Sequence, residues 1–344
     1  VMSNPTMHIL SYTHNELKDL FEKHGLKRYR ALQVLDWVYN KKVFDYSLMT
    51  NISKDDIELL KENFSLILPQ IERKLVSADG TVKYLFRYPD NATIESVLMD
   101  YDYGTSICVS SQSGCKMGCV FCASSAVPFS RNLYGYEITA QILKASLDSG
   151  KVISRAVVMG IGEPFDNYDN LINFLNVVNM KEGFNMGGRR ITISTCGIVP
   201  KIYEFADLCL QFNLSVSLHE VTDEKRSAIM PINRKYNIAS LIKACEYYFE
   251  KTNRRVSFEY ALIPGQNDSF DHAKRLSFLL KNVMCYVNVI PINPIENMKP
   301  HQNSRNLSGF CAILKENGIP VTIRRELGRD IEAACGQLRR QHDI

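Results

Sequence analysis

The spacing of apolar positions in the first part of the chain is helical. The stretch "THNELKDLFEKHG" begins with Thr13 as a predicted N-cap, places Leu17 and Phe21 on one face and ends at Gly25. A second helix is predicted over "YRALQVLDWVYNKK". This period indicates a small helical domain over residues 1–65.

The second helix and the stretch that follows it add two predictions. Four apolar residues of this helix are expected in the core: Leu32, Leu35, Trp37 and Val38. Further on, "ERKLVSADGTVKYLFRYP" has apolar-rich runs on both sides of Asp79-Gly80, a dipeptide typical of hairpin turns. We therefore expect a β extension over residues 66–104, followed by the main domain over 105–344.

From about residue 105, short β-branched runs alternate with longer segments of helical period. The predicted strands are "SICVSS", "RAVVMGI", "RITIST", "LSVSLH", "RVSFEYALI", "YVNVIPIN" and, as an extra, "VTIRR". Helical patterns such as "YEITAQILKASLDSG" and "YDNLINFLNVV" lie between them. Six or seven strands, each followed by a helix, imply an α/β domain with parallel pairing through right-handed crossovers.

Polar residues follow several of these predicted strands. Active sites of parallel sheets and barrels form where strands end in loops, at their C-terminal edge. The polar positions at predicted strand ends are Cys115 to Cys122, Glu163, Ser194, His219 and Asn293. We expect these residues to contribute to one site.

Composition narrows the class of protein. The 344 residues, of which 45% are hydrophobic, suffice for a sizeable core. No basic segment followed by an apolar one opens the chain, and no apolar run approaches the roughly 18 residues of a membrane span. We therefore expect a cytoplasmic protein without a membrane partner.

A net charge of +4 permits a polyanionic partner. Paired arginines that could contact phosphates are Arg189-Arg190, Arg254-Arg255, Arg324-Arg325 and Arg339-Arg340.

Three of the ten cysteines lie within eight residues, in the spacing C-x3-C-x2-C of Cys115, Cys119 and Cys122. A structural zinc site normally closes with four Cys or His ligands, and no fourth ligand lies nearby in the sequence. Three soft thiolates on a loop with Gly114 and Gly118 favour a 4Fe-4S cluster with one iron open, and zinc remains the alternative. The cysteines expected as buried small hydrophobic residues are Cys209, Cys245, Cys285 and Cys311.

This spacing resembles that of the radical S-adenosylmethionine (SAM) enzymes, in which the residue before the last cysteine, here Phe121, is usually aromatic. The resemblance implies that the open iron binds the amino and carboxylate groups of SAM. An electron from the cluster then cleaves SAM to a 5′-deoxyadenosyl radical. In "MGIGEP", Gly162 allows close approach and Glu163 can accept a hydrogen bond from the methionine ammonium.

A wider resemblance covers nearly the whole chain. The phrase "RRELGRDIEAACGQLRRQ" resembles the C-terminal motif of the RlmN family, radical SAM enzymes that methylate carbon 2 of adenine in 23S rRNA and tRNA. Further matching motifs are "CVSSQSGCKMGCVFCAS", "MGIGEP", "RRITISTCGIVP", "SLH", "MPINRKYNI", "NDS", "VNVIPINP", "RALQVLDWVY" and "MTNISK". The resemblance implies a partial (βα)6 radical SAM barrel with a helical accessory domain that binds RNA.

The resemblance also implies roles for single residues. Cys335 matches the cysteine that is methylated by one SAM and then attacked by the radical made from a second. Cys108 matches the cysteine that pairs with it in a transient disulfide, and Glu95 matches the proton acceptor. The positions matching SAM contacts are Gly162, Glu163, Ser194, Ser217, Leu218, His219 and Asn293. Spacing alone is also consistent with Ser194, Ser217 and His219 as residues whose hydrogen bonds are satisfied within the fold.

These roles agree with the chemistry of the reaction. Carbon 2 of adenine lacks a hydrogen acidic enough for an enzymatic base, whereas a radical on a cysteine-bound methyl group can add to that carbon. The target base must also leave its stack in the RNA. The resemblance further implies two SAM per turnover, an electron donor such as flavodoxin or ferredoxin, and a monomer.

Three other interpretations remain open from the sequence. The sister group Cfr methylates carbon 8, but it tends to read "GEA" where this chain has Gly162-Glu163-Pro164. A non-catalytic RNA-binding protein with zinc or an inert cluster would need neither Glu163 nor Cys335. A radical SAM enzyme with another substrate would not need Cys335. The chain departs from the common family pattern at Pro128, Glu220 and Gln266, which concerns RNA preference and loop order.

Overall fold

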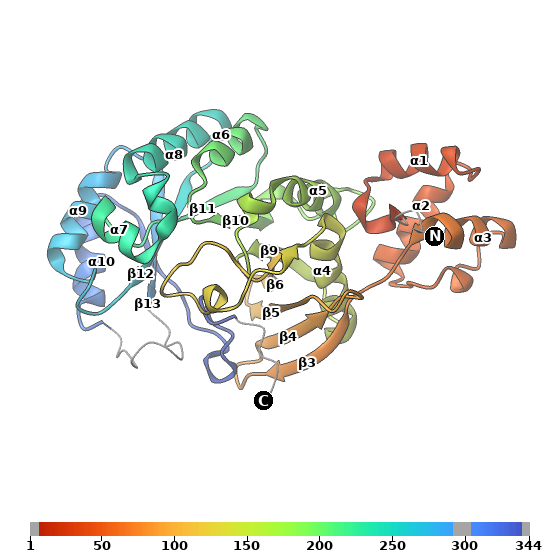
Figure 1. Cartoon of the computed structure of the whole chain (residues 1–344), viewed down its shortest axis with the longest axis horizontal. Coiled ribbons are helices and arrows are strands. Elements are labelled where there is room, and N and C mark those ends of the chain that lie inside the picture. Colours follow the sequence, from red (N-terminus) through yellow and green to blue (C-terminus); the bar gives the residue numbers. More distant parts are fainter. Residues whose placement is uncertain (1–6, 292–303, 339–344) are drawn as a thin grey trace.

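One long sheet, flanked by helices, forms the main body of the molecule (Figure 1). The computed structural model describes residues 7–291 and 304–338. The strands of the sheet are β3 (Gln70–Val76), β4 (Val82–Arg87), β5 (Thr93–Tyr101), β6 (Gly104–Val109), β9 (Ile153–Val158), β10 (Ile191–Thr195), β11 (Asn213–Ser217), β12 (Val256–Leu262), β13 (Cys285–Pro291) and β14 (Val321–Ile323). Within the described ranges they pair in the order β14-β13-β12-β11-β10-β9-β6-β5-β4-β3.

In this sheet, the seven strands β6, β9, β10, β11, β12, β13 and β14 pair in parallel, as the alternating pattern predicted. The helices between them are α4 (Gly135–Ser149), α5 (Tyr168–Asn179), α6 (Val199–Asp207), α7 (Asp223–Ile229), α8 (Ile238–Thr252), α9 (Phe270–Leu280) and α10 (Leu307–Glu316). Strands β14 and β3 are the two edges of this sheet, so the (βα) barrel is open. The predicted α/β class and partial barrel are confirmed.

The predicted hairpin continues the same sheet. Strands β3 and β4 pair antiparallel around the turn at Asp79 and Gly80, and β5 pairs antiparallel with both β4 and β6. The Asp79 carboxylate accepts a hydrogen bond from the Thr81 backbone N–H at 2.9 Å, and Gly80 has a φ of +86°. The register places Val97 of β5 opposite Cys108 of β6. The extension is therefore joined directly to the barrel.

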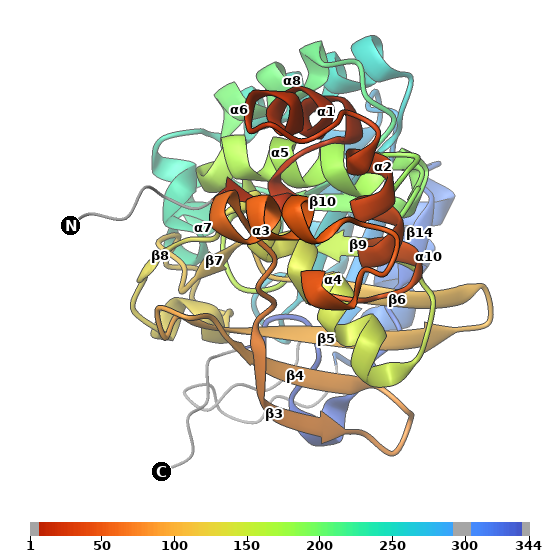
Figure 2. The same ribbon diagram turned by 90° about the vertical axis from the view of Figure 1, so that its right-hand side faces the viewer.

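A helical unit at the N-terminal end packs against α4 and α5 (Figure 2). Its helices are α1 (His14–Lys23), α2 (Arg30–Leu35) and α3 (Lys54–Asn63). Helix α1 begins where predicted, because Glu16 accepts a hydrogen bond from the Thr13 backbone N–H at 2.7 Å. Two short strands that the helical pattern did not reveal, β1 (Met7–His8) and β2 (Phe64–Ser65), pair in parallel.

One core prediction in the second helix is wrong. The buried stripe of this helix runs through Ala31, Val34, Leu35 and Val38, so Leu32 lies one position outside it and is 49% exposed. Trp37 is half-buried and packs against the core of the helical unit, from a π-helical turn that follows α2.

The cysteines expected in the core follow the prediction with one exception. Cys245, Cys285 and Cys311 are buried. Cys209 is exposed, in a turn after α6 where it has a φ of +51°.

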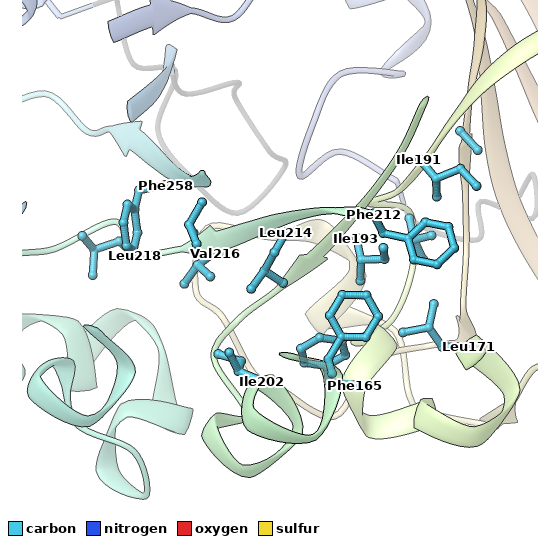
Figure 3. Packing of buried hydrophobic residues seen from close by; sticks show 14 of the residues in the cluster. Phe165, Leu171, Ile191, Ile193, Ile202, Phe212, Leu214, Val216, Leu218 and Phe258 are labelled. Carbon is cyan, nitrogen blue, oxygen red and sulfur yellow. The ribbon is translucent and has the colours of Figure 1, made fainter. Parts of the chain in front are cut away.

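The core beside β10 and β11 packs these strands against the helical layer. Ile193 and Val216 point from the strands toward the helical layer, where Phe165 and Ile202 pack (Figure 3). All four are buried.

In the described ranges, no helix has the length and apolarity needed to cross a membrane.

Candidate active site

A cavity lies at the C-terminal ends of the parallel strands. Its empty volume, including the open mouth, is about 990 Å³, within the size range of small-molecule sites, about 300–1,000 Å³. The sequence-predicted residues that line it are Cys115, Cys119, Cys122, Gly162, Glu163, Ser194, Ser217, His219 and Cys335. Leu218 is buried beside the strand end without lining the cavity. Asn293 lies outside the described residues.

The cysteine loop is closed at its base by a short antiparallel pair, β7 (Gln112–Ser113) and β8 (Arg131–Asn132). Gly114 follows β7 with a φ of +85°, and a Cβ atom there would lie 2.3 Å from the carbonyl oxygen of Pro128. Only glycine fits this approach. Pro128, one of the departures from the family pattern, is thus part of the contact that closes the loop.

The three thiols stand at different depths in the cavity wall. Cys119 is buried, and Cys115 and Cys122 are half-buried. Burial raises the pKa of the Cys115 thiol to about 11 and raises that of Cys119 as well. In the described part of the chain, no three Cys, His, Asp or Glu side chains converge on a position for a single metal ion. The ligands of a 4Fe-4S cluster bind different irons, so they need not converge on one position. The three thiols of the cysteine loop therefore fit such a cluster.

Glu163 is held rigidly at the end of β9. Its carboxylate accepts backbone N–H bonds from Cys196 at 2.7 Å and Phe165 at 3.0 Å. Its own backbone N–H donates to the Gln112 side chain at 2.9 Å. Burial raises the pKa of Glu163, whereas the hydrogen bond from Cys196 opposes that rise. A carboxylate has further lone pairs, so it can still accept a bond from a cationic ligand.

Gly162 is required by the same packing. Its φ is +107°, and a Cβ atom would lie 2.6 Å from the Gln112 side chain. The close approach expected from the sequence therefore brings the β9 loop against the base of the cysteine loop.

His219 follows β11 in the left-handed conformation, with a φ of +58°. Its Nδ1 accepts a hydrogen bond from the Ala261 backbone N–H at 2.9 Å, so the neutral ring carries its proton on Nε2. Burial, with a further effect of Arg226, lowers the pKa of His219 to about 3. Phe121 of the cysteine loop packs edge-on against the ring. His219 is therefore a neutral donor beside the thiols.

Sequence reasoning missed several cavity residues: Cys196, Met230, Glu259 and Arg324. The acidic Glu259 inside the apolar run "VSFEYAL" was a usable signal, because a charge in a central strand needs a partner. Its carboxylate accepts hydrogen bonds from Ser215 at 2.7 Å and Asn288 at 2.9 Å, and it pairs with Arg324 at 3.5 Å. One member of a predicted phosphate-binding arginine pair thus points into the cavity instead.

Arg226 is another residue of the site that the sequence did not indicate. It is 0% exposed although it belongs to the charged helix α7. Its guanidinium donates to the backbone oxygens of Cys196, Ser217 and Leu218 at 2.8, 2.9 and 3.1 Å. These bonds tie together the loops that follow β10 and β11, and so position several cavity residues at once.

Cys335 lies in a C-terminal segment that closes one side of the cavity. Its neighbours Ala333 and Leu338 pack with Val97 and Cys108 on the face of β5 and β6. Burial, together with the nearby Cys335 thiol, raises the pKa of Cys108 to about 12. Burial also raises the pKa of Cys335. The structure therefore brings the two cysteines together, although Cys108 does not line the cavity itself.

Glu95 lies on the same face of the sheet, two residues before Val97 on β5. It is 3% exposed, and its carboxylate lies 3.6 Å from the Lys83 ammonium. It lines a small hollow beside β3 and β4 instead of the main cavity. The structure thus places Glu95 on the Cys108 side of the sheet but outside the cavity wall.

The segment carrying Cys335 is held by the turn between β3 and β4. Asp330 accepts hydrogen bonds from the Ser77 hydroxyl at 2.5 Å and the Ala78 backbone N–H at 3.1 Å. In return, Asp79 accepts a bond from the Gly328 backbone N–H at 2.8 Å. Figure 1 shows this C-terminal segment in blue, beside the β3–β4 hairpin. Two carboxylates thus fix the segment in reciprocal directions.

We expect Asp330→Ala to loosen this segment. The variant removes both acceptors for the turn, so the amides of Ala333 to Gln337 should exchange with deuterium at least about tenfold faster, measured by mass spectrometry. Asp330→Asn keeps one acceptor oxygen and should show an intermediate rate. Unchanged exchange in Asp330→Ala would show that the carboxylate does not hold the segment.

Comparisons with known proteins give a consistent picture. The model of the "Ribosomal RNA large subunit methyltransferase N-terminal domain" matches residues 7–66, and that of the "Radical SAM superfamily" matches residues 109–276. A "Probable dual-specificity RNA methyltransferase RlmN" of Clostridium novyi (strain NT) is 49% identical, covering 97% of this chain and 98% of the relative. A protein of the same description from Clostridium botulinum (strain Okra / Type B1) is 50% identical with the same coverage.

A solved structure is similar over the same length. The crystal structure of a radical SAM methyltransferase from Sphaerobacter thermophilus has a TM-score of 0.92 and 41% identity, covering 97% of this chain and 100% of that one. The likeness therefore includes the helical unit, the sheet and the cysteine loop.

Proposed function

The chain belongs to the RlmN family of radical SAM methyltransferases, and on that premise we propose that it methylates carbon 2 of adenine in 23S rRNA and in tRNA. The observation that carries the proposal is the position of Cys335. This residue lies in the wall of the cavity that the cysteine loop lines, and its segment packs against Cys108. A radical SAM enzyme without a methyl carrier would need no thiol there.

The cavity offers residues for both cofactors. We assign Cys115, Cys119 and Cys122 to a 4Fe-4S cluster, and the strand-end residues to SAM: Gly162, Glu163, Ser194, Ser217, Leu218, His219 and Asn293. When bound, the cluster and SAM supply the 5′-deoxyadenosyl radical. The rigid Glu163 carboxylate suits the methionine ammonium, and the His219 Nε2–H suits an acceptor on the ligand. Two SAM are used in each turnover, one as methyl donor and one as radical source.

Two steps of the proposed reaction use thiols of the chain itself. Cys335 carries the methyl group whose carbon becomes joined to adenine. Once the adduct has lost the carbon 2 proton and passed its unpaired electron to an oxidised one-electron carrier, the Cys108 thiolate attacks the sulfur of Cys335. The sulfur–sulfur bond forms, the sulfur–carbon bond breaks, and its electron pair goes to the departing carbon, which takes up a proton to become the methyl group. The electron donor then returns the disulfide to two thiols by supplying two electrons. Glu95 accepts the proton that carbon 2 loses. This role rests on the family resemblance: Glu95 shares a face of the sheet with Cys108 but lies outside the cavity wall.

The remaining assignments concern partners. We propose that residues 1–65 form the RNA-binding accessory domain, that 66–104 form the extension that holds the Cys335 segment, and that 105–344 form the catalytic core. A flavodoxin or ferredoxin would supply electrons to a cytoplasmic monomer. Arg189 and Arg190 are exposed and are available for phosphate contacts.

The proposal is tested by incubating the anaerobically reconstituted protein with SAM, a reductant and unmodified 23S rRNA or tRNA. Mass spectrometry of the digested nucleosides should show 2-methyladenosine in both RNA classes. Finding 8-methyladenosine would place the enzyme with the Cfr group instead. Unmodified RNA from a protein that cleaves SAM would favour another substrate. Gly162-Glu163-Pro164, in place of "GEA", supports carbon 2.

A further inference from the structure

Arg226 is a buried cation whose direct partners are all neutral. Besides its three backbone oxygens, it donates to the Asn233 side-chain oxygen at 2.8 Å. The Asp223 carboxylate is reached only through Asn233, whose amide donates to it at 3.0 Å. In the part of the chain that the structure describes, no carboxylate pairs directly with the Arg226 guanidinium. Its charge is hydrogen-bonded but not neutralised by contact.

Such an arrangement is costly unless an anion is close. Removing a guanidinium from water is unfavourable, and neutral oxygens compensate for only part of the lost solvation. The cost falls when a negative group shares the same low-dielectric surroundings, because the attraction between charges is stronger there than in water. The position of Arg226 therefore indicates where an anion is to be expected.

Two positions near Arg226 can hold negative charge: the exposed Asp223 carboxylate on α7 itself and the cysteine loop at its buried Cys119. Helix α7, which carries Arg226, docks on that loop through the Val120 backbone N–H, which donates to the Ile229 oxygen at 3.1 Å. Cys119, Cys196 and Met230 pack together at this junction and line the cavity. Burial lowers the pKa of Arg226, whereas the nearby Cys196 and Cys119 thiols oppose that effect. The guanidinium thus lies behind the wall that holds one of the three thiols.

We propose that Arg226 provides the counter-charge for the iron-sulfur cluster and raises its reduction potential. This inference rests on the cluster site proposed above and goes beyond it, because it assigns a tuning residue that is not a ligand. A 4Fe-4S cluster with three thiolates is anionic, and reduction by a one-electron donor adds one more negative charge. A fixed cation nearby stabilises the reduced form more than the oxidised form. Arg226 would thereby make the electron transfer that precedes SAM cleavage easier.

The test is the reduction potential of the reconstituted cluster. Wild type and Arg226→Gln are titrated with dithionite under anaerobic conditions, and the reduced cluster is measured by electron paramagnetic resonance. At the wild-type midpoint, the ratio of reduced to oxidised cluster in Arg226→Gln should be at least about tenfold lower, a shift of about 59 mV for one electron. Arg226→Lys keeps the charge and should stay within about threefold of wild type.

Lys225→Met is the matched control. Lys225 is the preceding residue on α7, but it is exposed, so water screens its charge. Its removal should change the ratio less than about threefold. A shift in Arg226→Gln that Lys225→Met reproduces would indicate a general charge effect and overturn the assignment.

A second variant guards against misfolding of Arg226→Gln. Asn233→Asp leaves Arg226 in place and puts a carboxylate at the oxygen that now accepts its bond, so it should also lower the ratio. Circular dichroism of the apoproteins shows which variants are folded. A wild-type potential in either folded, cluster-loaded variant overturns the inference. Failure of the wild type to take up iron and sulfide would instead contradict the cluster site itself.

Discussion

Replacing Cys335 by alanine is expected to abolish RNA methylation while SAM cleavage continues. The thiol is the proposed methyl carrier, so its loss should lower 2-methyladenosine formation by at least about a thousandfold, as when a covalent nucleophile is removed. The β7–β8 pair that closes the base of the cysteine loop does not include Cys335. Formation of 5′-deoxyadenosine should therefore persist. Both products are measured in the same reaction by mass spectrometry.

The variant Cys108→Ala tests the proposed release step. It leaves the carrier in place but removes the thiol that releases the product, so RNA covalently joined to the protein should accumulate. This adduct is visible as a shift on a denaturing gel that nuclease reverses. Cys209→Ser, at an exposed position outside the cavity, should behave as wild type. Full methylation by Cys335→Ala would contradict the proposed mechanism.

Replacing Cys119 by alanine is expected to remove the cluster and every activity that depends on it. Cys119 is the buried member of the three proposed ligands. Two remaining thiols cannot hold three irons, so iron and sulfide after reconstitution should fall to background. Neither 5′-deoxyadenosine nor methylated RNA should then form. Colorimetric iron and sulfide determination and the visible absorption of the protein check the first part.

Cys245→Ala is the matched control for this variant. Cys245 is equally a buried thiol, but it lies on α8 in the main core and does not line the cavity. It should lower stability by the cost of a small cavity while keeping the iron content of the wild type. A full complement of iron and sulfide in Cys119→Ala would exclude this residue as a cluster ligand.

The parts of the fold that follow from local patterns could be predicted. Each barrel strand was predicted at its observed place because β-branched runs of that length are local signals, and the residues after them meet because parallel strands end at one edge. The position of Cys335 has no such signal. Its segment docks on a turn roughly 250 residues earlier, and only the family resemblance linked it to the cavity.

The residues whose environment was mispredicted or missed share a physical cause. Tertiary packing decides whether a side chain points into the protein or toward solvent. The helix "DEKRSAI" has the composition of a solvated surface, yet Arg226 points inward to bind strand-end carbonyls. Arg324 reads as half of a basic pair and faces Glu259 instead. Leu32 is apolar, as core residues usually are, but it lies beside the buried stripe of its helix. No period in the sequence distinguishes these cases.

The reciprocal carboxylate contacts between the β3–β4 turn and the Cys335 segment join two parts of the chain that are synthesised at different times. At about 5–20 residues per second, a ribosome needs on the order of tens of seconds to reach Cys335 after it has made the turn. The barrel strands and the β7–β8 pair can form in that interval, before the proposed methyl carrier exists. A chain truncated before Cys335 would then be expected to cleave SAM with no acceptor for the methyl group. On the proposed mechanism, synthesis of the segment that carries Cys335 is the step that adds RNA methylation to SAM cleavage.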